Sequence, residues 1–195
     1  MTTLRNLLSL VGLLTLVALV TVVVRYEPLF QQFRALDPAA LPLYGEMAGL
    51  LLESGNAAEA TVWMIPVEEG FSVEEVEETL RFVANELNMR NVGELPLYRE
   101  VRSLTGEPFP FLTIYMFCDP MTAARMVTYS MAFAAYLPCR IILQEDADGR
   151  LWLSTLNLDL MIHGGRPLPA ELREEALFIR DGLLEIMQRA ASGEF

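Results

Sequence analysis

The stretch FPFLTIYMFCDP, residues 109–120, decides the fold that we expect for this chain. Its first nine residues are almost wholly apolar and rich in aromatic types, which predicts a buried strand. Asp119-Pro120 follows at once, and aspartate before proline is typical of a helix start, with aspartate as the cap and proline in the first turn. The chain is therefore expected to pass directly from a core strand into a helix.

The residues after this stretch predict a helix, a hairpin and a last helix. The first helix reaches about Phe133, and two strands follow over residues 140–144 and 150–155. Asp148-Gly149 between them is a hairpin-turn pair. Residues 169–191 carry apolar side chains at helical spacing and predict a long amphipathic helix.

The residues before this stretch supply a strand and two helices. Residues 60–67 are β-branched and aromatic, and Ser72 with Glu75 forms a capping box in front of an amphipathic helix that reaches Leu87. Asp37-Pro38 predicts the start of an earlier helix, while residues 88–105 are expected to be irregular with at most one short strand. This order predicts an α+β fold with a mostly antiparallel sheet covered by helices.

The first residues predict a membrane anchor. Residues 7–24 form an uncharged apolar run, just long enough to cross a bilayer core of about 30 Å. A cleaved signal peptide is the alternative, but the run ends without the small-residue pattern of a cleavage site. We expect a head over residues 1–6, an anchor over 7–24, a juxtamembrane linker and spacer helix over 25–58, and an α+β domain over 59–195. A single pass through the inner (cytoplasmic) membrane with a periplasmic domain is the predicted location.

The charge of the chain restricts its partners. All 14 basic residues are arginine, and the net charge is −12. Such a surface repels nucleic acid, because phosphate contacts need clustered basic side chains. A basic protein partner would be attracted, although plain solubility explains the same charge.

Two cysteines and the only histidine fall at predicted element boundaries. Cys118 ends one strand, Cys139 begins another, and His163 precedes Gly164-Gly165. If the two strands are antiparallel neighbours, the cysteines could form a disulfide that closes a loop of about 20 residues and contributes about 3 kcal/mol. Two separate buried thiols that only pack in the core are the equal alternative.

The same three side chains are candidate metal ligands. Cys118, Cys139 and His163 would form a three-ligand site with an open fourth position, as zinc accepts. Copper(I) would fit if the thioethers of Met116, Met121, Met126 or Met161 lie nearby, and non-covalent haem could use the histidine. Supporting candidates are Asp119 and Asp159, the second of which shares a helix face with His163 if that segment is helical. A lone histidine beside a turn is more often a structural hydrogen-bonding group.

These motifs together resemble the domain of unknown function family 302. The resemblance rests on Cys118-Asp119-Pro120, Ala123-Ala124, Leu137-Pro138-Cys139-Arg140-Ile141 and the segment 145–150, and it spans roughly residues 60–160. It implies a compact α+β domain of TATA-binding-protein-like topology that is often dimeric, so a homodimer is expected. It carries over no catalytic residue. The anchor, the spacer helix and the tail from Asn157 onward are expected to be additions to the family pattern.

Three functions follow from these observations. The first is a membrane-anchored accessory domain that binds a ligand or partner, with a metal or haem in an envelope redox or sulfur-handling system. The second is a structural subunit that docks on a larger membrane complex. The third, a thiol-dependent enzyme, has the least support because no nucleophile motif surrounds either cysteine.

Overall fold

The protein divides into two units, which are described separately. The computed structural model describes the backbone of residues 2–195 and the side chains of Asn6 and of residues 10–195. The first unit covers residues 1–37 and the second covers residues 38–195. Of the predicted head, Met1 lies outside the described residues.

The first unit is one long helix, α1 (Thr2–Arg34), which continues through Pro28. Its segment Leu10–Arg34 is long and apolar enough to cross a bilayer, and all of its side chains are exposed. A signal sequence near the N-terminus can have the same length and apolar composition. α1 thus continues past the predicted anchor over 7–24 into the segment 25–58 that was expected to hold the juxtamembrane linker and spacer helix.

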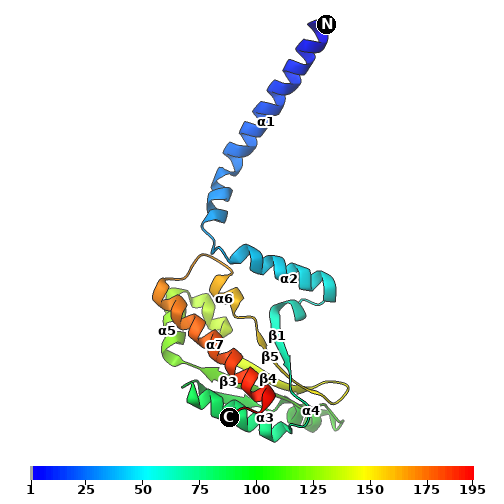
Figure 1. The fold of residues 1–195 in the computed structure, drawn as a ribbon, viewed down its shortest axis with the longest axis vertical. Coiled ribbons are helices and arrows are strands. Elements are labelled where there is room, and N and C mark those ends of the chain that lie inside the picture. The colour runs from blue at the N-terminus through cyan, green and yellow to red at the C-terminus, as the bar shows by residue number, and fades with distance from the viewer. Residues whose placement is uncertain (1) are drawn as a thin grey trace. The chain divides into compact units, whose positions relative to one another are not determined.

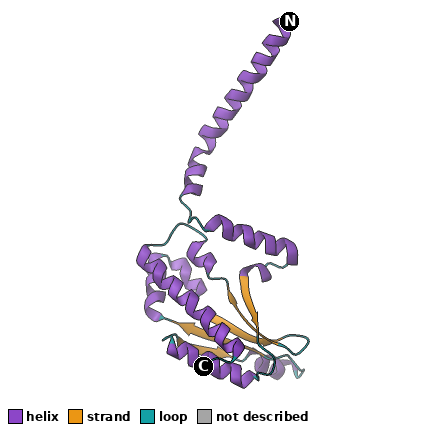
Figure 2. Ribbon diagram, viewed as in Figure 1, coloured by secondary structure: helices purple, strands orange, loops and turns teal. Residues whose placement is uncertain are grey.

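The second unit is built on one five-stranded sheet (Figures 1 and 2). The strands are β1 (Val62–Pro66), β2 (Arg90–Leu95), β3 (Leu112–Cys118), β4 (Cys139–Glu145) and β5 (Leu151–Leu156). Their spatial order is β1-β5-β4-β3-β2, and every neighbouring pair is antiparallel. The prediction of an α+β fold with an antiparallel sheet is confirmed.

Helices cover one face of this sheet. The helices of this unit are α2 (Ala40–Ser54), α3 (Val73–Glu86), α4 (Leu97–Thr105), α5 (Pro120–Tyr129), α6 (Asp159–His163) and α7 (Ala170–Ser192), with two 3-10 turns, η1 (Glu59–Thr61) and η2 (Met131–Tyr136). α3 and α7 pack against each other and lie along the sheet (Figure 1). Alternate strand residues such as Tyr115, Ile141 and Leu153 point into the core beneath them, and all three are fully buried.

Local capping signals place the helix starts. Ser72 and Glu75 form the predicted capping box at α3, with both reciprocal hydrogen bonds present. The Asp119 carboxylate accepts a hydrogen bond from the backbone N–H of Thr122 at 2.8 Å, and Pro120 is the first residue of α5. These two predictions are confirmed.

Two other local predictions need correction. Residues 88–105 contain the one short strand that was considered, β2, but the rest is not irregular, because it forms the helix α4. The helix expected to start at Asp37-Pro38 begins at Ala40, and its capping residue Ala39 supplies no side-chain hydrogen bond. The second difference is two residues, within the range over which assigned helix ends vary.

Candidate functional site

A small cavity lies where β3 ends and β4 begins. Its lining comes from these two strand ends and from α5, η2, α6 and α7, and its volume is about 30 Å³. Four of the lining residues carry sulfur, namely Cys118, Cys139, Met126 and Met161. Thr122 and the capping Asp119 also line it, while the remaining wall is apolar. The site therefore concentrates soft sulfur atoms around a space about the size of one water molecule.

Both cysteines are free, so the disulfide alternative is wrong for this structure. The strand register gives the reason: Phe117, not Cys118, pairs with Cys139 across β3 and β4. Cys118 is the next residue along β3, so it does not lie directly opposite Cys139. Because side chains alternate along a strand, the two cysteines start from opposite faces of the sheet. They still line one cavity because Cys118 is the last residue of its strand, where the chain turns towards α5.

The surroundings keep both thiols protonated. Burial raises the pKa of the Cys139 thiol to about 11, and the nearby Cys118 adds to this increase. Burial also raises the pKa of Cys118, with the negative charge of Asp119 as the second cause. Because the thiolate is the reactive form, neither cysteine is activated as a nucleophile at neutral pH.

The predicted three-ligand site is not formed. Within the described part of the chain, no three histidine, cysteine, aspartate or glutamate side chains come close enough to hold a metal ion. His163 ends α6 and is not among the residues that line the cavity, although Met161 from the same helix is. Of the residues predicted for this site, the fold brings Cys118, Cys139 and Met161 to one cavity, but the His163 imidazole does not line it.

The glycine after His163 has a packing role. The Tyr44 hydroxyl of α2 donates a hydrogen bond of 2.7 Å to the carbonyl oxygen of Gly164. A Cβ atom on Gly164 would lie 2.3 Å from the carbonyl oxygen of Leu160 and 3.1 Å from the Tyr44 hydroxyl. The absence of a side chain at Gly164 therefore lets Tyr44 of α2 approach the end of α6 and hold the two helices together.

The remaining supporting candidates lie elsewhere. Asp159 accepts a hydrogen bond of 2.8 Å from Arg180, so its carboxylate connects α6 to α7. Met116 packs on β2, where a Cβ atom added to Gly93 would come within 2.8 Å of its terminal methyl group. Neither residue lines the sulfur cavity in the described structure.

The volume of the cavity decides which ligands it could hold. Pockets for drug-sized molecules measure about 300–1,000 Å³. A space of about 30 Å³ has no room for haem, so non-covalent haem is not a ligand for this site. A single ion or a water molecule fits.

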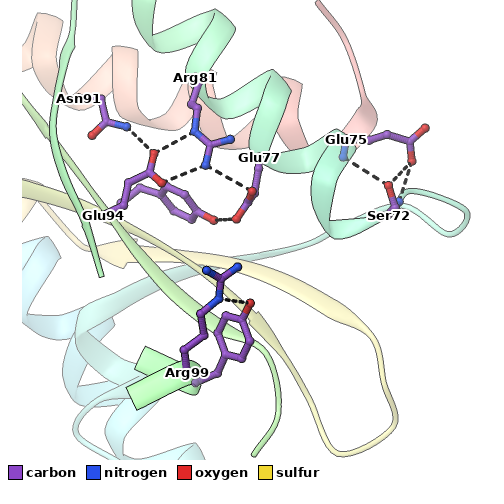
Figure 3. A network of polar contacts seen from close by, with 9 residues as sticks. Ser72, Glu75, Glu77, Arg81, Asn91, Glu94 and Arg99 are labelled. Atoms are coloured by element: carbon purple, nitrogen blue, oxygen red, sulfur yellow. Dashed lines mark hydrogen bonds and ion pairs between the residues drawn. The ribbon is translucent and has the colours of Figure 1, made fainter. Parts of the chain in front are cut away.

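A second polar cluster was not predicted from the sequence (Figure 3). The hydroxyl of the fully buried Tyr115 donates a short hydrogen bond to Glu77 of α3. Arg81, one helical turn further on, contacts Glu77 at 3.3 Å and Glu94 of β2 through two bonds of 2.9 and 3.0 Å. Asn91 donates to the same Glu94 carboxylate at 2.7 Å. This network fastens α3 to the edge of the sheet.

The electrostatics of the network match this structural role. The Arg81 guanidinium holds the pKa of Glu94 below its ordinary value, and burial followed by the bond to Glu77 raises the pKa of Tyr115 well above its own. Arg81 and Glu94 are therefore ionised and the Tyr115 phenol is neutral at neutral pH. Only the fold reveals that one acidic residue of α3, Glu77, reaches Tyr115.

A solved structure of similar fold supports the architecture. The crystal structure of an uncharacterised conserved DUF302 protein from Bacillus stearothermophilus superimposes with a TM-score of 0.54 at 18% sequence identity. The match covers 67% of this chain and 98% of that one. A search of curated proteins gives no match.

The family match is wider than the sequence motifs indicated. It spans residues 65–190, whereas the motifs extended only to about residue 160. The tail with α6 and most of α7 therefore belongs to the family domain and is not an addition to it, while α1 and α2 lie outside the match. The cysteines and Met161 fall within it. The chain belongs to the DUF302 family, described as a domain of unknown function.

Proposed function

We propose that this protein is a membrane-anchored accessory domain that binds one soft monovalent metal ion, Cu(I), in the sulfur-lined cavity. The observation that carries the proposal is the convergence of two thiols and two thioethers, from four different elements, on a cavity of about 30 Å³. Thiolate and thioether ligands are soft, and soft ligands favour Cu(I), zinc and iron–sulfur clusters over harder metals. Zinc is less suited, because its usual partners are thiolate, imidazole and carboxylate.

The protonated state of the thiols is compatible with metal binding. A metal ion displaces thiol protons, and its positive charge offsets the two thiolate charges that burial opposes. With both protons displaced, one positive ion and two thiolates leave a single negative charge in the site. The apparent affinity should therefore rise with pH, by up to about two decades per pH unit while both thiols are protonated.

The test is a competition for Cu(I) with the full-length protein in detergent micelles, anaerobically and with a reductant. A chromogenic Cu(I) chelator such as bicinchoninate reports the metal that the protein removes. We expect one Cu(I) per chain, and an affinity at least about 100-fold weaker in Cys118→Ala and Cys139→Ala, as loss of one strong ligand implies. Met161→Leu should weaken binding by a smaller factor.

The matched control is Met121→Leu. Met121 is an exposed methionine of α5 outside the sulfur cavity, so this variant should bind as the parent does. Retention of one tight Cu(I) in the variant that lacks both cysteines would refute the proposal. So would equal effects of the Met161 and Met121 substitutions together with no effect of either cysteine.

The wider context of this binding function also forms part of the proposal. A Cu(I)-holding domain on the outer side of an inner membrane would serve a metal or redox system of the envelope. A homodimer and a basic protein partner stay predictions from the resemblance and the negative charge. Mass measurement of the purified protein in micelles tests the first, and salt-dependent co-purification tests the second.

A further inference from the structure

The outward face of α2 is an apolar surface that the domain leaves open. Ala40 and Leu43 are buried and Met47 is half-buried, so one side of the helix packs on the domain. Leu41 is 57% exposed and Leu52 is 87% exposed on another side. The apolar surface of α2 is therefore wider than the side that packs on the domain.

The exposed side is a continuous stripe. Its members follow helical spacing over about three turns, at Leu41, Tyr44, Ala48, Leu51 and Leu52. No charged residue lies on it, because the two acidic residues of the helix, Glu46 and Glu53, occupy a different side. The Tyr44 hydroxyl is bonded to Gly164, so the orientation of the helix about its own axis is fixed on the domain.

The short connection between α1 and α2 limits how far α2 can lie from the end of the candidate membrane span. Five residues separate Arg34, the end of the candidate membrane span, from Ala40, the start of α2. Even fully extended, such a connection reaches only about 20 Å. The last turns of the span carry exposed Leu29, Phe30 and Phe33, which suit the interfacial layer of a bilayer. An exposed apolar helix tethered this closely is held at a lipid surface at high effective concentration.

We propose that the exposed stripe of α2 inserts into the interfacial layer of the bilayer that α1 crosses. The helix would lie in the membrane plane with its apolar stripe at the boundary between headgroups and acyl chains. It carries no basic residue, so anionic lipid is not its attractant and a zwitterionic surface is sufficient. The domain is thereby laid on the membrane instead of being held away from it on a spacer. This proposal does not depend on metal binding.

The test places a fluorescent reporter on the stripe of the full-length protein, reconstituted at one copy per nanodisc in phosphatidylcholine. Leu52→Trp puts an indole at an 87% exposed position of α2, and the control Leu104→Trp puts one at an 85% exposed position of α4. Lipids brominated near the top of the acyl chain quench nearby indoles. The emission added by Leu52→Trp should be quenched by about half or more, and that added by Leu104→Trp should not.

Each other outcome overturns the proposal. Equal quenching of the two added indoles, or quenching of neither, means that α2 does not enter the lipid. A blue-shifted but unquenched indole at position 52, seen only when several copies share a nanodisc, means that a second copy covers the stripe instead. Unchanged circular dichroism confirms that the variants fold, and unchanged Cu(I) binding in Leu52→Trp separates this result from the fate of the metal proposal.

Discussion

Removal of one hydroxyl group from the core tests how α3 is held on the sheet. Tyr115→Phe keeps the buried ring and deletes only the donor to Glu77. A hydrogen bond to a charged group contributes about 1.5–3 kcal/mol. The Glu77 side chain is 22% exposed, so water replaces part of the lost bond and we expect the lower end, about 1.5–2 kcal/mol. For a domain of this size the melting temperature should fall by about 3–8 °C.

The assay is thermal and urea unfolding of the full-length protein in micelles at pH 7. Tyr129→Phe is the matched control, because Tyr129 is 48% exposed and loses no buried bond; it should change stability by less than about 0.5 kcal/mol. A Tyr115→Phe variant no less stable than this control would refute the reasoning. A double-mutant cycle with Glu77→Ala should give a coupling energy of about 1–2 kcal/mol, and a value near zero would show that the bond is not made.

The pH dependence provides an independent readout of the same bond. The folded-state pKa of Tyr115 is raised above its ordinary value of 10.0 by burial and then by the bond to Glu77. A raised pKa means that the stabilisation is complete below pH 10 and declines at higher pH, since the unfolded phenol loses its proton first. The difference in stability between the parent and Tyr115→Phe should therefore shrink above pH 10.

Three further changes have defined outcomes. Asp119→Ala removes the cap of α5 and should cost about 1 kcal/mol in urea unfolding, whereas Asp119→Asn keeps most of the cap and should lower the pKa of Cys118 in a thiol-reactivity titration. Gly164→Ala forces a Cβ atom against the Leu160 carbonyl and the Tyr44 hydroxyl; it should cost about 1–3 kcal/mol and expose α2 to proteolysis, and an intact, protease-resistant α2 would contradict the contact. Burial raises the pKa of Cys139 from 9.0 to about 11, so the stability that its protonated thiol gives the folded state is complete below pH 9 and is lost by pH 11. Between pH 9 and pH 11 the free energy of unfolding of the parent should fall by about 2–3 kcal/mol more than that of Cys139→Ala.

Strong local signals in the sequence were enough to predict most elements. The apolar run before Cys118 became β3, the capping box became the start of α3, and the Asp148-Gly149 pair became the hairpin between β4 and β5. Each of these signals acts through bonds or side-chain periodicity within a few residues. These signals can therefore be recognised in the sequence without knowledge of the fold.

The helix α4 shows why other elements were not predicted. It has only nine residues, none of them buried, and no side-chain cap at its start. Its support comes from outside its own sequence: Arg102 donates to the carbonyl oxygen of Phe109 at 2.9 Å, and the rings of Tyr98 and Phe111 lie 4.8 Å apart. A short helix is marginal alone, so such contacts decide whether it forms.

The candidate site divides in the same way between sequence and tertiary structure. The sequence by itself determined that two soft ligands stand at the facing ends of two strands, because the strand and helix signals around Cys118 and Cys139 are local. Only the tertiary structure decided that Phe117 pairs with Cys139, that Met126 and Met161 complete the sulfur lining, and that His163 does not join it. Strand register and helix docking are set by the packing of whole faces against one another. A shift of one residue reverses which side chains meet, and no local pattern encodes that choice.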